Sequence, residues 1–151
     1  YEAAKKVSDE AIKTFLGHDD DYKRFQLWEE SAPERMQFEM MGGRSHFSAV
    51  GEPLTPAQEE RLIETMVTVR KSPSDLPDLA KPENFSPGNL TDDMIARQMQ
   101  QFDRNAQAVS QQAAAFLSPA QLQGLAKLHE QQRSMAEMGL KMSSSMMKAN
   151  E

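Results

Sequence analysis

Four methionines near the C-terminal end are the residues best suited to chemistry. We call them the methionine row: Met135, Met138, Met142 and Met146. They follow one another at steps of three or four residues, so a helix would place them on one face. Thioether sulfurs are soft ligands that suit Cu(I), so a copper site is one hypothesis. The alternative, which we favour, is a helix interface or an adaptable apolar surface for varied partners.

The histidines, carboxylates and glycines form no recognisable catalytic or metal site. His18 precedes Asp19 to Asp21, but consecutive helical residues point in different directions and cannot converge on one ion. His46 and His129 stand alone, and no H-x-x-x-H, H-E-x-x-H or E-x-x-H pairing occurs. The glutamates lie in polar contexts, where nothing would raise a pKa. We therefore expect a protein that is not an enzyme and has no cofactor.

The composition excludes several other classes of protein. The chain has no cysteine, which removes disulfides, thiolate catalysis and cysteine-ligated metals. Its net charge of -6 provides no basic field for nucleic acid. No apolar run is long enough for a membrane span, so we expect no membrane insertion. With 38% hydrophobic and 26% charged residues, the composition is typical of helices with one apolar stripe and wide solvated faces.

Helix start and stop residues predict an all-α, elongated hairpin or bundle of about five helices in a single domain, residues 1–151. Residues 1–43 form an N-terminal helical pair, divided near Gly17, in which Pro33 should kink or interrupt the second helix. A loop over residues 42–53 follows, and a third helix begins at Thr55. Its core face would be Leu62, Ile63, Met66 and Val69.

The second half of the chain contains a proline-rich connector and two long, coiled-coil-like helices. Four prolines between residues 71 and 89 forbid a continuous helix there. A fourth helix begins at Thr91, with apolar residues at alternating steps of four and three: Ile95, Met99, Phe102, Ala106, Val109, Ala113 and Phe116. The fifth begins at Ser118. The link between them is so short that they form either an antiparallel hairpin or a sharply kinked arm.

Three aromatic residues near the N-terminus have two interpretations. Tyr22, Phe25 and Trp28 could be an exposed recognition patch, since exposed aromatics anchor partners. Aromatics at this spacing more often form the core of a small helical domain, and we predict a core here. Residues 1–50 would then be either a separate small module or a segment docked on the later helices.

One five-residue pattern occurs twice, as Leu54-Thr55-Pro56-Ala57-Gln58 and Leu117-Ser118-Pro119-Ala120-Gln121. A leucine staple, a hydroxyl cap and a proline in the first turn make a good helix start, so propensity alone can explain the repeat. Two such boxes in a helical, cysteine-free, methionine-rich chain also resemble the Spy/CpxP-like periplasmic LTxxQ family. The resemblance covers about residues 54–140 of an LTxxQ-like helical region that spans residues 54–151. Its family motif falls on these residues: Leu54, Thr55, Gln58, Leu117, Ser118 and Gln121.

This resemblance implies a periplasmic helical protein that pairs into a curved homodimer. The family includes ATP-independent chaperones, regulators of stress responses and metal-responsive proteins. Ser118 replaces the usual threonine, and the connector at 71–89 has no counterpart in the family pattern.

We therefore predict a periplasmic homodimer that binds other polypeptides, as a chaperone or stress-response regulator. The contacts are expected from the methionine row together with Phe102 and Phe116. Two alternatives stay open, which are a periplasmic copper-binding or metal-sensing protein and a structural adaptor with one dedicated partner.

Overall fold

The computed structural model describes residues 2–79 and 81–150, and over these residues its regular secondary structure consists of helices, with no strand. Tyr1, Ala80 and Glu151, which the predicted domain and connector include, lie outside the described residues. The described part has two short 3-10 helices, η1 (Pro82–Asn84) and η2 (Pro87–Asn89). Its seven α-helices are α1 (Glu2–Leu16), α2 (Asp19–Glu30), α3 (Ala32–Met40), α4 (Gly43–Ala49), α5 (Pro56–Arg70), α6 (Asp92–Ala113) and α7 (Pro119–Ala149). The all-α class is confirmed, and the number of described α-helices is larger than the predicted number of about five.

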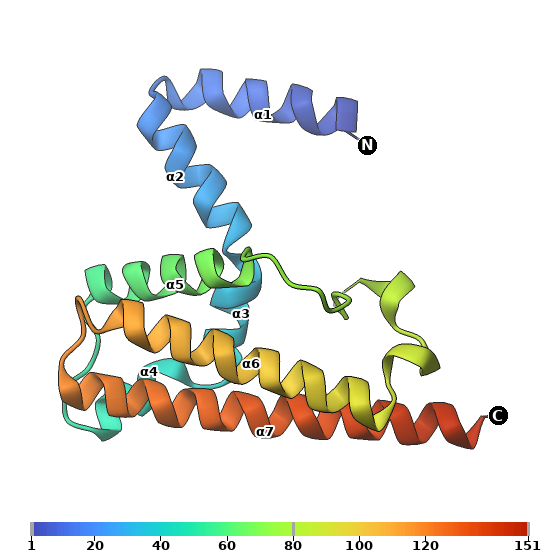
Figure 1. Cartoon of the computed structure of the whole chain (residues 1–151). Coiled ribbons are helices and arrows are strands. Elements are labelled where there is room, and N and C mark those ends of the chain that lie inside the picture. The colour runs from blue at the N-terminus through green and yellow to red at the C-terminus, as the bar shows by residue number, and fades with distance from the viewer. Residues whose placement is uncertain (1, 80, 151) are drawn as a thin grey trace.

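Helices α6 and α7 form an antiparallel hairpin, and α5 packs along α6 (Figure 1). The chain reverses over residues 114–118, where the Leu117 amide donates to the Ala113 carbonyl at 2.8 Å. Of the two predicted arrangements, the hairpin is the one observed. The apolar seam explains the packing, because these residues are buried at the helix contacts: Leu62, Ile63, Val69, Val109, Ala113, Leu125 and Leu128. Phe102, Ala106 and Phe116 of the predicted seam are half-buried.

Three helices, α1, α2 and α3, occupy the described part of residues 1–43, where a helical pair was predicted. The expected interruption occurs at Ser31, just before Pro33 in the first turn of α3. Gly42 then adopts a left-handed φ of 62°, which ends α3 and lets α4 begin at once. The prediction of a loop over residues 42–53 was therefore wrong for the residues that form α4. This segment is helical because the Phe47 side chain, 0% exposed, is buried in the core and stacked against Phe38.

Helices α1 and α2 project from the rest of the molecule as an N-terminal arm, residues 2–30 (Figure 1). Neither helix has a buried residue. The predicted aromatic core was wrong, because Trp28 is 58% exposed while Tyr22 and Phe25 are only half-buried. Phe25 and Trp28 stack on each other with ring centroids 6.5 Å apart, but they enclose no interior. The segment that does dock on the later helices is α3 with α4.

The connector, residues 71–89, contains no α-helix in its described part, as predicted. Gln98 of α6 donates to the Pro77 carbonyl at 2.9 Å, which attaches the connector to the hairpin. Leu90, 1% exposed, is buried where the chain enters α6. Among the apolar side chains of the connector, Leu76 and Leu79 are half-buried and Phe85 is 42% exposed.

Candidate polypeptide-binding surface

The two repeated boxes begin α5 and α7 with the same hydrogen bonds. Thr55 Oγ1 accepts from the Gln58 amide at 3.1 Å, and Gln58 Oε1 accepts from the Thr55 amide at 3.0 Å. Ser118 and Gln121 repeat this arrangement at 3.1 and 3.0 Å. Each box is therefore a complete capping box, which satisfies backbone donors that a helix start otherwise leaves free.

The two glutamines also bond to each other and join the helix starts. Each Nε2 donates to the other residue's Oε1 at 3.0 Å. The second donor of Gln58 reaches the Phe116 carbonyl at 3.0 Å, and that of Gln121 reaches the Pro53 carbonyl at 3.3 Å. Both carbonyls lie two residues before the cap of the opposite box, so the joint is locally symmetric. We call it the glutamine joint. It fixes the end of the bundle from which α7 extends.

One face of the first half of α7, residues 119–132, is enclosed by neighbouring elements. Gly124 lies so close to α4 that an added Cβ would be 2.9 Å from the His46 carbonyl oxygen. Leu125 and Leu128 are both 0% exposed. Burial also lowers the pKa of His129 from 6.5 to about 4, because the charged imidazolium loses solvation. The His46 Nε2 to Gln131 Oε1 contact, at 2.7 Å, lies close to the end of this enclosed half.

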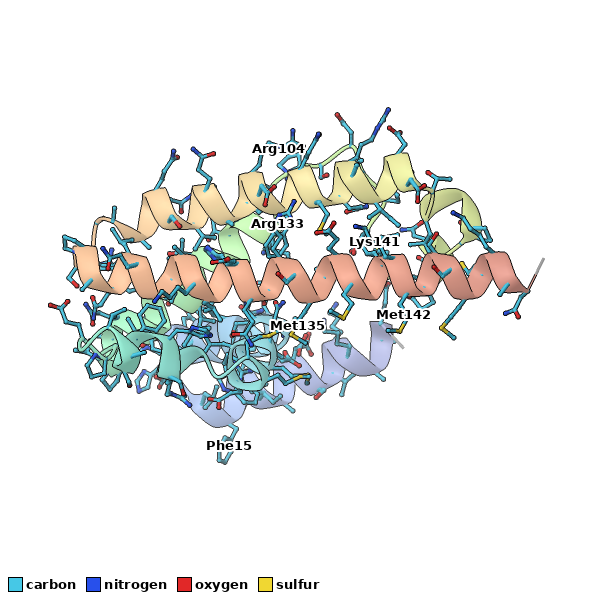
Figure 2. All side chains as sticks on the ribbon, turned by 90° about the horizontal axis from the view of Figure 1, so that it is seen from below. Phe15, Arg104, Arg133, Met135, Lys141 and Met142 are labelled. Atoms are coloured by element: carbon cyan, nitrogen blue, oxygen red, sulfur yellow. The ribbon has the colours of Figure 1, made fainter. Side chains whose placement is uncertain are left out.

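Beyond Gln131 the same face of α7 carries the methionine row. Met135, Met138, Met142 and Met146 are 52%, 62%, 59% and 63% exposed. Figure 2 shows Met135 and Met142 on the side of α7 opposite Arg133 and Lys141. Over residues 133–149, only Ser144 is buried. The row is thus an apolar face on a regular helix, and it contributes nothing to the core.

A groove of about 450 Å³ lies beside the row, between the connector, α6 and α7. It brings together two of the predicted binding residues, Phe102 and Met135, with Leu79, Phe85 and Leu140. Phe116 lies elsewhere, half-buried against the core, and the Arg61 guanidinium is 4.4 Å from its ring centroid. Phe116 is therefore separate from the groove residues.

Ion pairs hold the opposite side of α7. Arg133 contacts Asp103 of α6 at 2.8 Å and Glu137 at 3.0 Å, and Lys141 contacts Glu137 at 2.7 Å. The hydrogen bond from Lys141, assisted by Arg133, lowers the pKa of Glu137. The charges are thus partnered among themselves on that side, which leaves the methionine row as the uncharged face.

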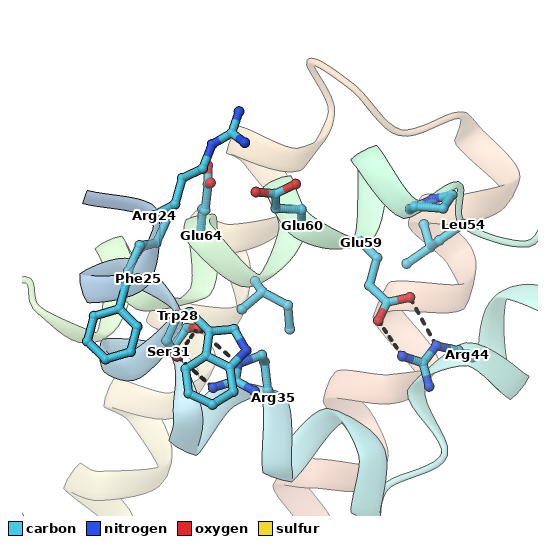
Figure 3. A pocket seen from close by; sticks show the side chains of 13 residues that line it. Arg24, Phe25, Trp28, Ser31, Arg35, Arg44, Leu54, Glu59, Glu60 and Glu64 are labelled. Carbon is cyan, nitrogen blue, oxygen red and sulfur yellow. Dashed lines mark hydrogen bonds and ion pairs between the residues drawn. The ribbon is translucent and has the colours of Figure 1, made fainter. Parts of the chain in front are cut away.

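A second groove, of about 1050 Å³, lies between α2, α4 and α5 (Figure 3). Trp28 forms one wall, with the Arg35 guanidinium 4.2 Å from its ring centroid. Arg44, bound to Glu59 at 2.7 Å, forms another, and Ile63 also lines the groove. This groove was not predicted, because Arg44 was assigned to a loop and Trp28 to a core. The alternative interpretation of Tyr22, Phe25 and Trp28 as an exposed patch was the one that indicated a surface site in this region.

Three further findings bear on possible functions. Among residues 2–79 and 81–150, no group of three or more histidine, cysteine, aspartate or glutamate side chains could hold a metal ion. Across the same residues, no helix combines the length and apolar character that crossing a bilayer requires. The chain matches no family model, no curated protein and no solved structure.

Proposed function

We propose that this protein binds other polypeptides through the methionine row and the adjoining groove, without ATP, as a periplasmic chaperone or stress-response regulator. The observation that carries the proposal is the exposure of all four row side chains on one face of α7. Burying a methionine side chain contributes about 1.5–3 kcal/mol, so covering even part of the row supplies useful affinity. Unbranched thioether side chains also adapt to partners of different shape.

The repeated boxes support placing the chain with the LTxxQ type of periplasmic protein. Their glutamines do more than cap a helix, because each one bonds the other box across the bundle. A joint that needs both boxes gives a physical reason for the repeat beyond helix propensity. Periplasmic location and pairing into a homodimer belong to the same proposal.

The decisive test is suppression of client aggregation in the absence of ATP. We expect the parent protein to protect a chemically denatured client such as reduced α-lactalbumin, and Met138→Asp with Met142→Asp to abolish most of that protection. Met36→Asp is the matched control, since Met36 is 64% exposed on α3 and outside the row. Absence of protection by the parent, or equal loss in the control, would refute the proposal.

Cu(I) binding is the second candidate, favoured by four solvent-exposed thioethers at helical spacing. It predicts stoichiometric Cu(I) uptake that disappears when all four row residues become leucine. Leucine keeps the apolar face but removes the ligand, so polypeptide binding should persist in this variant. Titration with a Cu(I) chelator as competitor separates the two functions.

A further inference from the structure

Four of the six exposed methionines lie together in the methionine row, on one face of α7. The chain has no cysteine, so thioether sulfur is its first target for a mild peroxide. Susceptibility of sulfur to oxidants follows solvent exposure, and the four row sulfurs belong to side chains more than half exposed. Met99 of α6, at 6% exposure, is enclosed in the same hairpin. Met36 and Met40 are exposed too, but on α3.

We propose that the methionine row is a reversible oxidation switch, in which sulfoxide formation releases the bound polypeptide. The inference rests on the proposed function of the same surface. In each step the sulfur lone pair attacks a peroxide oxygen, the O–O bond breaks, and an S–O bond forms as one water is released. The sulfur loses two electrons and the peroxide gains them. A methionine sulfoxide reductase returns the thioether while two thiols become a disulfide and a second water leaves.

Oxidation of the row changes the surface of the protein while its fold persists. A sulfoxide is polar and chiral, so it disrupts an apolar interface. The row side chains bury no core surface, and a solvated sulfoxide on them creates no buried polar group. Arg133 lies on the other side of α7, where its ion pair with Asp103 joins α7 to α6 and its ion pair with Glu137 lies within α7. Met99 is different, because a sulfoxide there would be forced into the core.

The order of reaction can be measured directly. Stepwise hydrogen peroxide, with a metal chelator present, is followed by peptide mass mapping of every methionine. We expect the row, Met36 and Met40 to gain one oxygen each before Met99 does. Helicity and the melting temperature should stay unchanged at that stage. Reaction of Met99 before the row, or loss of helicity as the row reacts, would overturn the inference.

Binding of reduced α-lactalbumin is then compared between the two forms. We expect affinity to fall by about tenfold or more on oxidation of the row and to return with the reductase. A variant with leucine at all four row positions should bind and keep its affinity after peroxide. The Met36→Leu, Met40→Leu double variant should remain sensitive.

The outcomes separate the switch from the function on which it rests. No binding by the reduced parent would refute the polypeptide-binding function, and the switch with it. Two results would refute the switch alone. One is polypeptide binding that survives full oxidation of the row, and the other is an equal loss of binding after peroxide in the variant with leucine at all four row positions.

Discussion

The two halves of α7 carry apolar side chains at similar spacing but use them differently. In residues 119–132, Leu125 and Leu128 are fully buried. In residues 133–149, the methionine row lies on a continuation of the face that α4 covers, yet each of its side chains is more than half exposed. The difference comes from α4, which contacts the first half through Gly124 and Gln131. An apolar stripe thus shows which face of a helix can be buried, and the neighbouring elements determine which part of that face is buried.

The largest effect should come from removing a side chain in the enclosed half. Leu128→Ala leaves a cavity at a fully buried position, and we expect a loss of about 2–5 kcal/mol in unfolding free energy. Met142→Ala removes an exposed side chain and should cost no more than about 0.5 kcal/mol. Urea unfolding measures both. Equal losses would mean that the second half is enclosed as well.

The enclosed half should also give the molecule a pH dependence. The pKa of His129 is about 4 in the folded protein and 6.5 as its ordinary value, so the unfolded state takes up a proton first. The stability that this neutral histidine contributes is complete above pH 6.5 and is lost as the pH falls toward 4. The loss should reach at most about 3 kcal/mol.

Comparison of the parent with His129→Gln isolates the contribution of His129 to stability, since His18 and His46 are present in both proteins. The difference in unfolding free energy between parent and variant should change across pH 4–6.5 and stay level above it. A flat difference across that range would show that His129 is solvated.

At the base of the enclosed half, the glutamine joint should contribute somewhat less. Gln121→Ala deprives Gln58 of a partner and leaves the Ser118 amide without its acceptor, for an expected cost of about 1–3 kcal/mol. A double-mutant cycle with Gln58→Ala should give a coupling energy of about 0.5–3 kcal/mol. Strict additivity would show that the boxes cap their helices independently.

The sequence predicted most of the hairpin because local rules and tertiary packing agree there. The hydroxyl caps at Thr55, Thr91 and Ser118 mark the observed helix starts, and the α6 seam is buried or half-buried as expected. The bond between Gln58 and Gln121 could not be predicted, since it needs the helix starts to meet in space.

The N-terminal half was predicted less well, for a related reason. Loop-forming residues at 42–53 suggested no helix, whereas burial of Phe47 stabilises α4. The aromatics of α2 have core-like spacing but no opposing apolar surface, so Trp28 remains exposed. In both cases the contacts between neighbouring surfaces of the fold overrode the local sequence pattern. Exposure of the methionine row depends on the same information.

The smallest expected effect comes from one substitution, glycine to alanine, made in each half of α7. Glycine in a helix interior costs about 1 kcal/mol relative to alanine, and this gain is the same at both α7 glycines. At Gly139 nothing lies within 4 Å of an added Cβ, so Gly139→Ala should raise the unfolding free energy by nearly that amount. At Gly124 the added Cβ would lie 2.9 Å from the His46 carbonyl oxygen, which is backbone and cannot rotate away. Gly124→Ala should therefore displace α4 and lower the unfolding free energy, by about 1 kcal/mol net of the propensity gain. Opposite signs in urea unfolding would assign the enclosure of the first half to α4, whereas two stabilising substitutions would show that α4 does not hold that position.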